Sequence, residues 1–176
     1  IDESFHIPVL TEEVIEFLVV KKNGMFLDVT SGFGGHSAAI LEELNGGSLI
    51  ATDQDPEAIR FLKSKFKTEK RISIHQARFS ELHKLFSAND FDGILADIGV
   101  SSYQLDTAER GFSFMKDGPL DMRMNQNIGE DASSWLNNAP EQEISNIIWK
   151  YGEEKKAKRI AKAIVEARKS FKIRAT

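Results

Sequence analysis

Cysteine is absent from the 176-residue sequence, and proline and tryptophan are scarce, with four and two copies. Without cysteine the chain can form no disulfide framework and has no thiolate ligand for metal or redox chemistry. It also lacks any apolar run of the roughly 20 residues that span a membrane. The first residues include Asp2 and Glu3 in place of a signal-peptide pattern, and the formal net charge is −4. These absences predict a cytoplasmic protein with no membrane segment and no metal centre.

The residues that are present suit a globular protein with an uneven distribution of charge. A hydrophobic content of 41% is enough for one sizeable buried core. Between Lys155 and Arg174, nine basic residues accompany a single acid, Glu166. A basic helix face of this kind is usually only solvated, but beside a ligand crevice it also suits contacts with phosphates. The sequence leaves both interpretations open.

Residues 25–37 are the most informative stretch, and they read MFLDVTSGFGGHS. Met25–Val29 has the length and apolar character of a strand, and a helical pattern begins near His36. Strand, glycine turn and helix open the nucleotide-binding βαβ unit, in which glycines let a ligand approach the backbone closely. The glycines between strand and helix are Gly32, Gly34 and Gly35.

The ligand of this loop is expected to be cationic. The dinucleotide fingerprint is not met, because Ser37 stands where the third glycine should be. An acid near the strand end, Asp28, suits a cation better than a pyrophosphate. S-adenosylmethionine carries a sulfonium cation and no phosphate, so we interpret the stretch as a loop for that cofactor. A tight turn without any ligand is the alternative.

Two aspartates follow the second expected strand, Ser48–Thr52, and they predict different roles. Asp53 lies at the strand end about 20 residues beyond the glycine loop, where an acid accepts the ribose hydroxyls of an adenosine. Asp55 precedes Pro56, and proline suits the first position of a helix. We therefore expect Asp53 to bind ribose and Asp55 to cap the next helix.

Two further strand ends carry candidate cofactor residues. Arg71–Gln76 alternates like a strand and leads to Phe79, which could pack on the adenine ring. The alternative is a core phenylalanine that enters a helix capped by Ser80. Phe91–Asp97 is the fourth expected strand, and it ends in the acid Asp97.

Helical patterns alternate with these strands. After an extended Phe5–Leu10, Thr11 is expected to cap a helix that stops at Asn23-Gly24. Further helices are expected at 37–44 and 56–66. Alternating strands and helices predict a parallel sheet, whose carboxyl ends form a ligand crevice. The acids Asp28, Asp53 and Asp97 all belong to that edge, which predicts a cofactor-binding α/β domain.

The character of the chain changes beyond Tyr103. Residues 104–124 are mostly polar and show no clear periodicity. Two glycines and one proline lie between their charged residues. A loop of this length in a compact domain is usually functional. Asp131 is expected to cap a short helix, Pro140 to start a helix that Gly152 ends, and 153–170 to form a last helix.

Six segments together give a specific likeness. The sequence resembles the MraW family, the bacterial small-subunit (16S) rRNA cytosine-N4 methyltransferases, from about Phe5 to the last residue. The segments are HIPVL at His6, GFGGHS at Gly32, DQDP at Asp53, DIGVSS at Asp97, QLDTAERGFSF at Gln104 and DGPLDMRM at Asp117.

The resemblance implies a class I S-adenosylmethionine-dependent methyltransferase, with a Rossmann-like parallel sheet and an inserted helical domain. Residues 1–105 would form the cofactor-binding domain with the first four strands. Residues 106–176 would form an active-site loop and the start of a helical RNA-recognition insertion. The likeness covers the first part of the family's length, so the fold is expected to be incomplete at the C-terminus. The family's cofactor contacts would fall on Gly34, Gly35, His36, Asp53, Phe79, Asp97 and Gln104.

The implied function is methyl transfer to the N4 amine of a cytidine in small-subunit ribosomal RNA. Asp97 is the candidate catalytic residue, because an acceptor near the amine would hold its N–H groups. Contact with the cofactor is its competing role. A non-catalytic cofactor- or RNA-binding fragment is the alternative function, and a nicotinamide-dependent Rossmann enzyme is a second one. The partner would be ribosomal RNA within the subunit, and a homodimer is left open.

Overall fold

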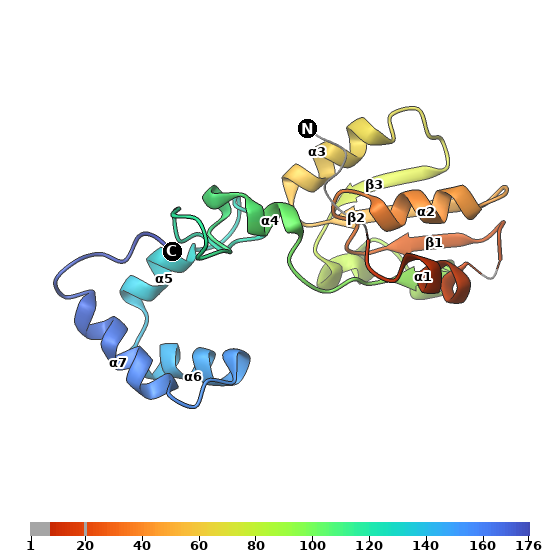
Figure 1. Ribbon diagram of the computed structural model, residues 1–176. Coiled ribbons are helices and arrows are strands. Elements are labelled where there is room, and N and C mark those ends of the chain that lie inside the picture. The colour runs from red at the N-terminus through yellow and green to blue at the C-terminus, as the bar shows by residue number, and fades with distance from the viewer. Residues whose placement is uncertain (1–7, 20) are drawn as a thin grey trace. The chain divides into compact units, whose positions relative to one another are not determined.

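The computed structural model describes residues 8–19 and 21–176, and the chain divides into two units, Ile1–Ser102 and Tyr103–Thr176 (Figure 1). The first unit alternates strands and helices. Its elements are α1 (Thr11–Leu18), β1 (Met25–Asp28), α2 (Gly35–Glu43), β2 (Ser48–Asp53), α3 (Pro56–Lys65), β3 (Ile72–Gln76), the 3₁₀ segments Phe79–Lys84 and Ala88–Asp90, and β4 (Gly93–Leu95).

The four strands form one parallel sheet in the order β3-β2-β1-β4. Asp28 pairs in register with Ala51 and Leu95, and Asp53 pairs with Gln76. The carboxyl ends of the strands therefore meet at one edge, because all four run in the same direction. This confirms the predicted Rossmann-like α/β fold, and it places the acids that end β1 and β2 at a common edge.

Successive side chains of a strand point to opposite faces of the sheet, and in the central strands both faces carry apolar side chains. Phe26 and Leu49 pack with Ile40 and Leu41 of α2 in one core cluster. Leu27 faces the other way and packs with Leu82 of the 3₁₀ segment Phe79–Lys84. The first face is covered by helices, whereas the cluster on the second is formed with shorter segments.

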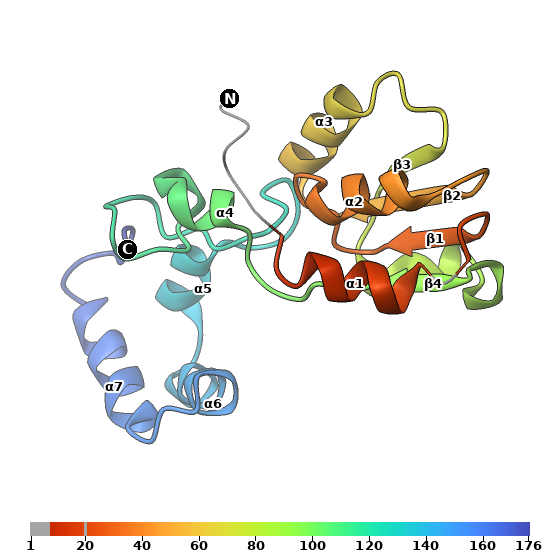
Figure 2. The same ribbon diagram turned by 45° about the vertical axis from the view of Figure 1, so that its right-hand side comes forward.

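The second unit contains helices and one long irregular segment. Its elements are α4 (Ser102–Asp106), which starts at the unit boundary, the 3₁₀ turn Ala108–Arg110, α5 (Ala132–Asn138), α6 (Glu141–Gly152) and α7 (Ala157–Ala167). Ala139, Ile144 and Ala161 are its buried core residues, and α6 and α7 lie side by side (Figures 1 and 2). An isolated antiparallel bridge joins Pro119 to Ala175.

Three predicted helix ends are wrong. Thr11 is the first residue of α1 and not its cap, because its hydroxyl donates to the Pro8 carbonyl. Ser80 lies inside its 3₁₀ segment. The first helix ends at Leu18, before the predicted stop at Asn23-Gly24, whereas α6 ends at Gly152 as predicted. The extended segment predicted at Phe5–Leu10 lies mostly outside the described residues.

Candidate cofactor site

The loop between β1 and α2 is held by a buried carboxylate. Asp28 is 1% exposed; its Oδ2 accepts the Ser37 hydroxyl at 2.7 Å, and its Oδ1 accepts the Thr30 N–H at 3.2 Å. Burial raises its pKa from 3.8 to about 6, although both hydrogen bonds act in the opposite direction. Asp28 therefore ties the strand end to the first turn of α2. Both oxygens also serve the loop itself, and the contact of Asp28 with a ligand cation stays a prediction.

The glycines of this loop serve different purposes. Gly34 has φ of 72°, and a Cβ there would lie 2.7 Å from Leu62 Cδ2 and 2.8 Å from Phe66 Cε2. Only glycine lets the loop pack this closely against α3. Gly32 also has a positive φ, of 50°, but a Cβ there would meet no atom closer than the Thr30 carbonyl oxygen, at 4.0 Å. The backbone at Gly32 thus borders open space.

Asp53 ends β2 and is oriented by two backbone amides. Its Oδ2 accepts the Gly32 N–H and its Oδ1 accepts the Asp55 N–H, both at 2.8 Å. Partial burial raises its pKa, and the two amide bonds oppose that shift. Each carboxylate oxygen accepts more than one hydrogen bond, so a fixed Asp53 can also accept ligand hydroxyls.

Asp55 has the separate role that the sequence predicts. It is 3% exposed and precedes the first residue of α3, Pro56. Its Oδ1 accepts the Glu57 N–H at 3.0 Å, which is the bond of an N-cap. The prediction that Asp55 caps this helix is confirmed.

Asp97 and His36 come together at the same edge. Asp97 lies two residues beyond β4, its N–H donates to the Thr30 hydroxyl at 2.7 Å, and its side chain is 51% exposed. His36 Nε2 lies 3.8 Å from Asp97 Oδ2, and the His36 side chain is 9% exposed. Strand-end reasoning missed His36, although its place in the first turn of the helix after the glycine loop was a usable signal.

Phe79 and Gln104 lie in different units. Phe79 is the first residue of the 3₁₀ segment after β3 and is 52% exposed, so the alternative of a core phenylalanine is wrong. Gln104 belongs to α4 in the second unit and is 5% exposed. Its role toward a cofactor stays a prediction. Among residues 8–19 and 21–176, no cluster of histidine and acidic side chains could hold a metal ion.

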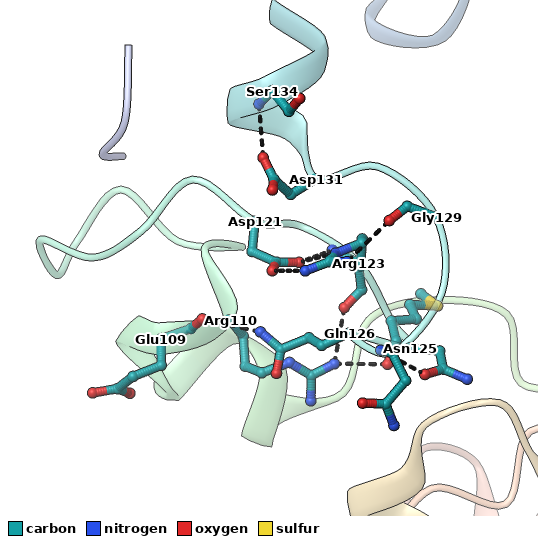
Figure 3. A network of polar contacts seen from close by, with 11 residues as sticks. Glu109, Arg110, Asp121, Arg123, Asn125, Gln126, Gly129, Asp131 and Ser134 are labelled. Atoms are coloured by element: carbon teal, nitrogen blue, oxygen red, sulfur yellow. Dashed lines mark hydrogen bonds and ion pairs between the residues drawn. The ribbon is translucent and has the colours of Figure 1, made fainter. Parts of the chain in front are cut away.

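An ion-pair network orders the long polar loop of the second unit (Figure 3). Asp121 binds Arg123 through both oxygens, with Oδ1–Nε at 2.9 Å and Oδ2–Nη2 at 2.6 Å. Arg123 Nη1 donates to the Gly129 carbonyl at 3.0 Å. Arg110 is 3% exposed, and its Nη2 donates to the carbonyls of Arg123 and Met124 at 3.0 and 2.8 Å. The arginine bonds lower the pKa of Asp121.

The sheet order, the glycine loop and the fixed strand-end acid define a ligand-binding protein of the Rossmann-like α/β class. Within that class, the model of the MraW methylase family matches residues 3–176. The chain belongs to this family.

In the described part of the chain, no helix has the length and apolarity to cross a membrane.

Relatives extend over nearly the whole chain. The chain is 51% identical over 164 residues to "Ribosomal RNA small subunit methyltransferase H" of Xanthomonas euvesicatoria. This alignment covers 93% of the chain and 49% of the Xanthomonas protein. The protein of the same description from Xylella fastidiosa is 49% identical, over 93% of the chain and 52% of its own length. The chain thus spans about half the length of these curated relatives.

Similarity to solved structures is weaker. The crystal structure of P. horikoshii TYW2 in complex with MeSAdo aligns with a TM-score of 0.40 and 20% identity, over 80% of this chain and 51% of that one. At this level the alignment adds nothing to the family assignment.

Proposed function

We propose that the chain is the cofactor-binding part of an enzyme that transfers a methyl group from S-adenosylmethionine to the N4 amine of a cytidine in small-subunit ribosomal RNA. Membership of the methylase family supports the reaction class. The observation that carries the proposal is the Asp53 carboxylate, held by the amides of Gly32 and Asp55 at the carboxyl edge of the sheet.

The residues at this edge fit that cofactor. Asp53 would accept the ribose hydroxyls, and the exposed ring of Phe79 would pack on the adenine. The open space outside Gly32 lets the methionine part approach the backbone. When bound, the cofactor supplies a methyl group on a positively charged sulfur. Contacts with it are proposed for Gly34, Gly35, His36, Asp53, Phe79, Asp97 and Gln104.

Asp97 is the proposed group for the chemistry on the amine. The exocyclic nitrogen of cytosine is a poor nucleophile because its lone pair is delocalised into the ring. An exposed carboxylate can accept an amine N–H, orient the nitrogen and stabilise positive charge that develops on it. The Thr30 hydroxyl fixes the Asp97 backbone, and His36 lies beside the carboxylate. His36 is therefore a positioning residue for Asp97, which also contacts the cofactor in this proposal.

Binding of cofactor or RNA without turnover is the second candidate function. A nicotinamide enzyme is disfavoured, because Ser37 replaces the third fingerprint glycine and donates to buried Asp28.

Two measurements separate these functions. Calorimetric titration of the chain should show binding of S-adenosylmethionine and none of NAD. Tritium-methyl transfer to small ribosomal subunits then distinguishes the enzyme from the non-catalytic fragment. Binding of NAD in place of S-adenosylmethionine would refute the proposed function.

A further inference from the structure

A groove of about 520 Å³ lies in the second unit, between one face of α6 and the start of α7. From α6 it is lined by Gln142, Asn146 and Trp149, whose spacing of four and three residues places them on the same helix face. Residues 155–159 form the other wall. All the lining residues belong to the second unit, and none of them is a proposed cofactor residue.

An exposed aromatic ring lies in this polar groove. The chain has two tryptophans, and Trp135 packs against the apolar core of the second unit. Trp149 is instead 66% exposed. Trp149 is not part of the core cluster of this unit, and its exposed ring offers a flat face on which a nucleic-acid base can stack.

Four cations line the opposite wall. Lys155, Lys156, Lys158 and Arg159 are all exposed, and no acid lines the groove. In the part of the chain that the structure describes, no ion pair joins these four side chains to a carboxylate. Farther along the chain, Lys169 is paired with Glu166 at 2.8 Å. The groove therefore presents concentrated positive charge on a chain whose net charge is −4.

Polar side chains on the α6 wall suit the edge of a base. The Gln142 Nε2 donates to the Asn146 Oδ1 at 2.8 Å, so the two amides are aligned along the helix. Amide groups carry both donors and acceptors, as base edges do. Stacking, phosphate attraction and edge recognition together are the features with which proteins bind unpaired nucleotides.

We propose that this groove binds a single-stranded segment of RNA, with a base stacked on Trp149 and adjacent phosphates against residues 155–159. The inference rests on the proposed function, and it deepens it by assigning an RNA contact away from the cofactor residues. Packing of another protein segment into the groove is disfavoured, because it would desolvate four cations that lack acidic partners in the groove.

The two tryptophans allow a direct test of stacking. In a Trp135→Phe chain, Trp149 is the remaining fluorophore, and titration with a single-stranded oligoribonucleotide should quench its emission. In the matched Trp149→Phe chain, Trp135 should report no quenching. Trp149→Ala should weaken binding roughly 5- to 150-fold, the range of one base–aromatic stack, while Tyr151→Ala, also exposed, changes it little.

A charge-matched pair of variants tests whether residues 155–159 contact phosphates. Lys155→Gln combined with Arg159→Gln should lower the salt slope of binding by about 1.4, because single strands contribute about 0.7 per neutralised phosphate. Lys162→Gln combined with Lys172→Gln removes the same charge outside the groove and should leave the slope nearly unchanged. Circular dichroism checks that each variant is folded.

The same samples separate this inference from the proposed function. S-adenosylmethionine affinity, measured on every variant, tests the cofactor site independently of RNA. Equal slopes for the two double variants, unquenched Trp149, or no RNA binding by a folded chain would overturn the groove assignment. Each of these results is compatible with intact cofactor binding.

Discussion

Two irregular segments of this protein are organised by carboxylates in opposite ways. In the glycine loop of the first unit, Asp28 and Asp53 accept hydrogen bonds from neutral amides and a hydroxyl, and their pKa values are raised. In the loop of the second unit, Asp121 is paired with Arg123 and its pKa is lowered. A buried carboxylate with a raised pKa and no cationic partner is typical of a functional site, whereas a carboxylate paired with an arginine acts as a structural tie. The comparison supports the proposed binding role of the first loop and describes the second as a scaffold.

The largest effect on stability is expected for the scaffold. Arg110→Met leaves the partly buried carbonyls of Arg123 and Met124 without their guanidinium donor, which should cost about 2–4 kcal/mol. Chemical denaturation measures the loss, and hydrogen exchange should localise it to residues 111–131. Lys172→Met, at an exposed lysine of the same unit, is the control and should stay within about 0.5 kcal/mol. Equal losses in both variants would remove Arg110 from its structural role.

The buried acid of the first loop should give a pH-dependent effect. The folded pKa of Asp28, about 6, lies above its ordinary value of 3.8, so the folded state binds more protons between these values. Its contribution to stability is present below about pH 4 and is lost as the pH rises through 6. Asp28→Asn keeps the shape without the charge, so its stability relative to the wild type should improve by up to about 3 kcal/mol from pH 4 to 7. Denaturant melts across this range measure the difference, and a constant difference would contradict the assignment.

Asp97→Asn tests the most exposed of the three acids at the carboxyl edge of the sheet. If Asp97 serves the amine, single-turnover methylation should fall by about a hundredfold or more, because a positioned acid–base group contributes on that scale. If it serves the cofactor, S-adenosylmethionine affinity should fall while the rate at saturation holds. We expect losses in both quantities, and no loss in either would place Asp97 outside the active site.

A smaller effect is expected for the acid that caps α3. Asp55→Ala should cost about 1 kcal/mol of stability, because the Glu57 N–H loses its acceptor. Asp55→Asn retains an acceptor and should recover most of the loss in the same thermal melts. A variant that loses cofactor affinity and keeps full stability would reverse the roles assigned to the two aspartates.

Features set by local chemistry could be predicted from the sequence. The Asp55-Pro56 pair indicated an N-cap, and the strand-end acids indicated the ligand edge, because parallel strands bring their ends together. The burial of Asp28 could not be predicted, since its partner Ser37 comes into reach only when the glycine loop folds. The bonds of Arg110 leave no periodic signal, because they run to main-chain carbonyls in an irregular loop.

A thermodynamic cycle on Asp53 tests the central claim most directly. Asp53→Ala should weaken S-adenosylmethionine binding about ten- to a hundredfold, because a carboxylate bonded to ribose hydroxyls contributes about 1.5–3 kcal/mol. The 2′-deoxy analogue of the cofactor removes one of those hydroxyls from the other side of the contact. Calorimetric titration should show that the analogue loses affinity for the wild type but loses little more for Asp53→Ala. Additive losses from the two changes would contradict a contact between Asp53 and the ribose.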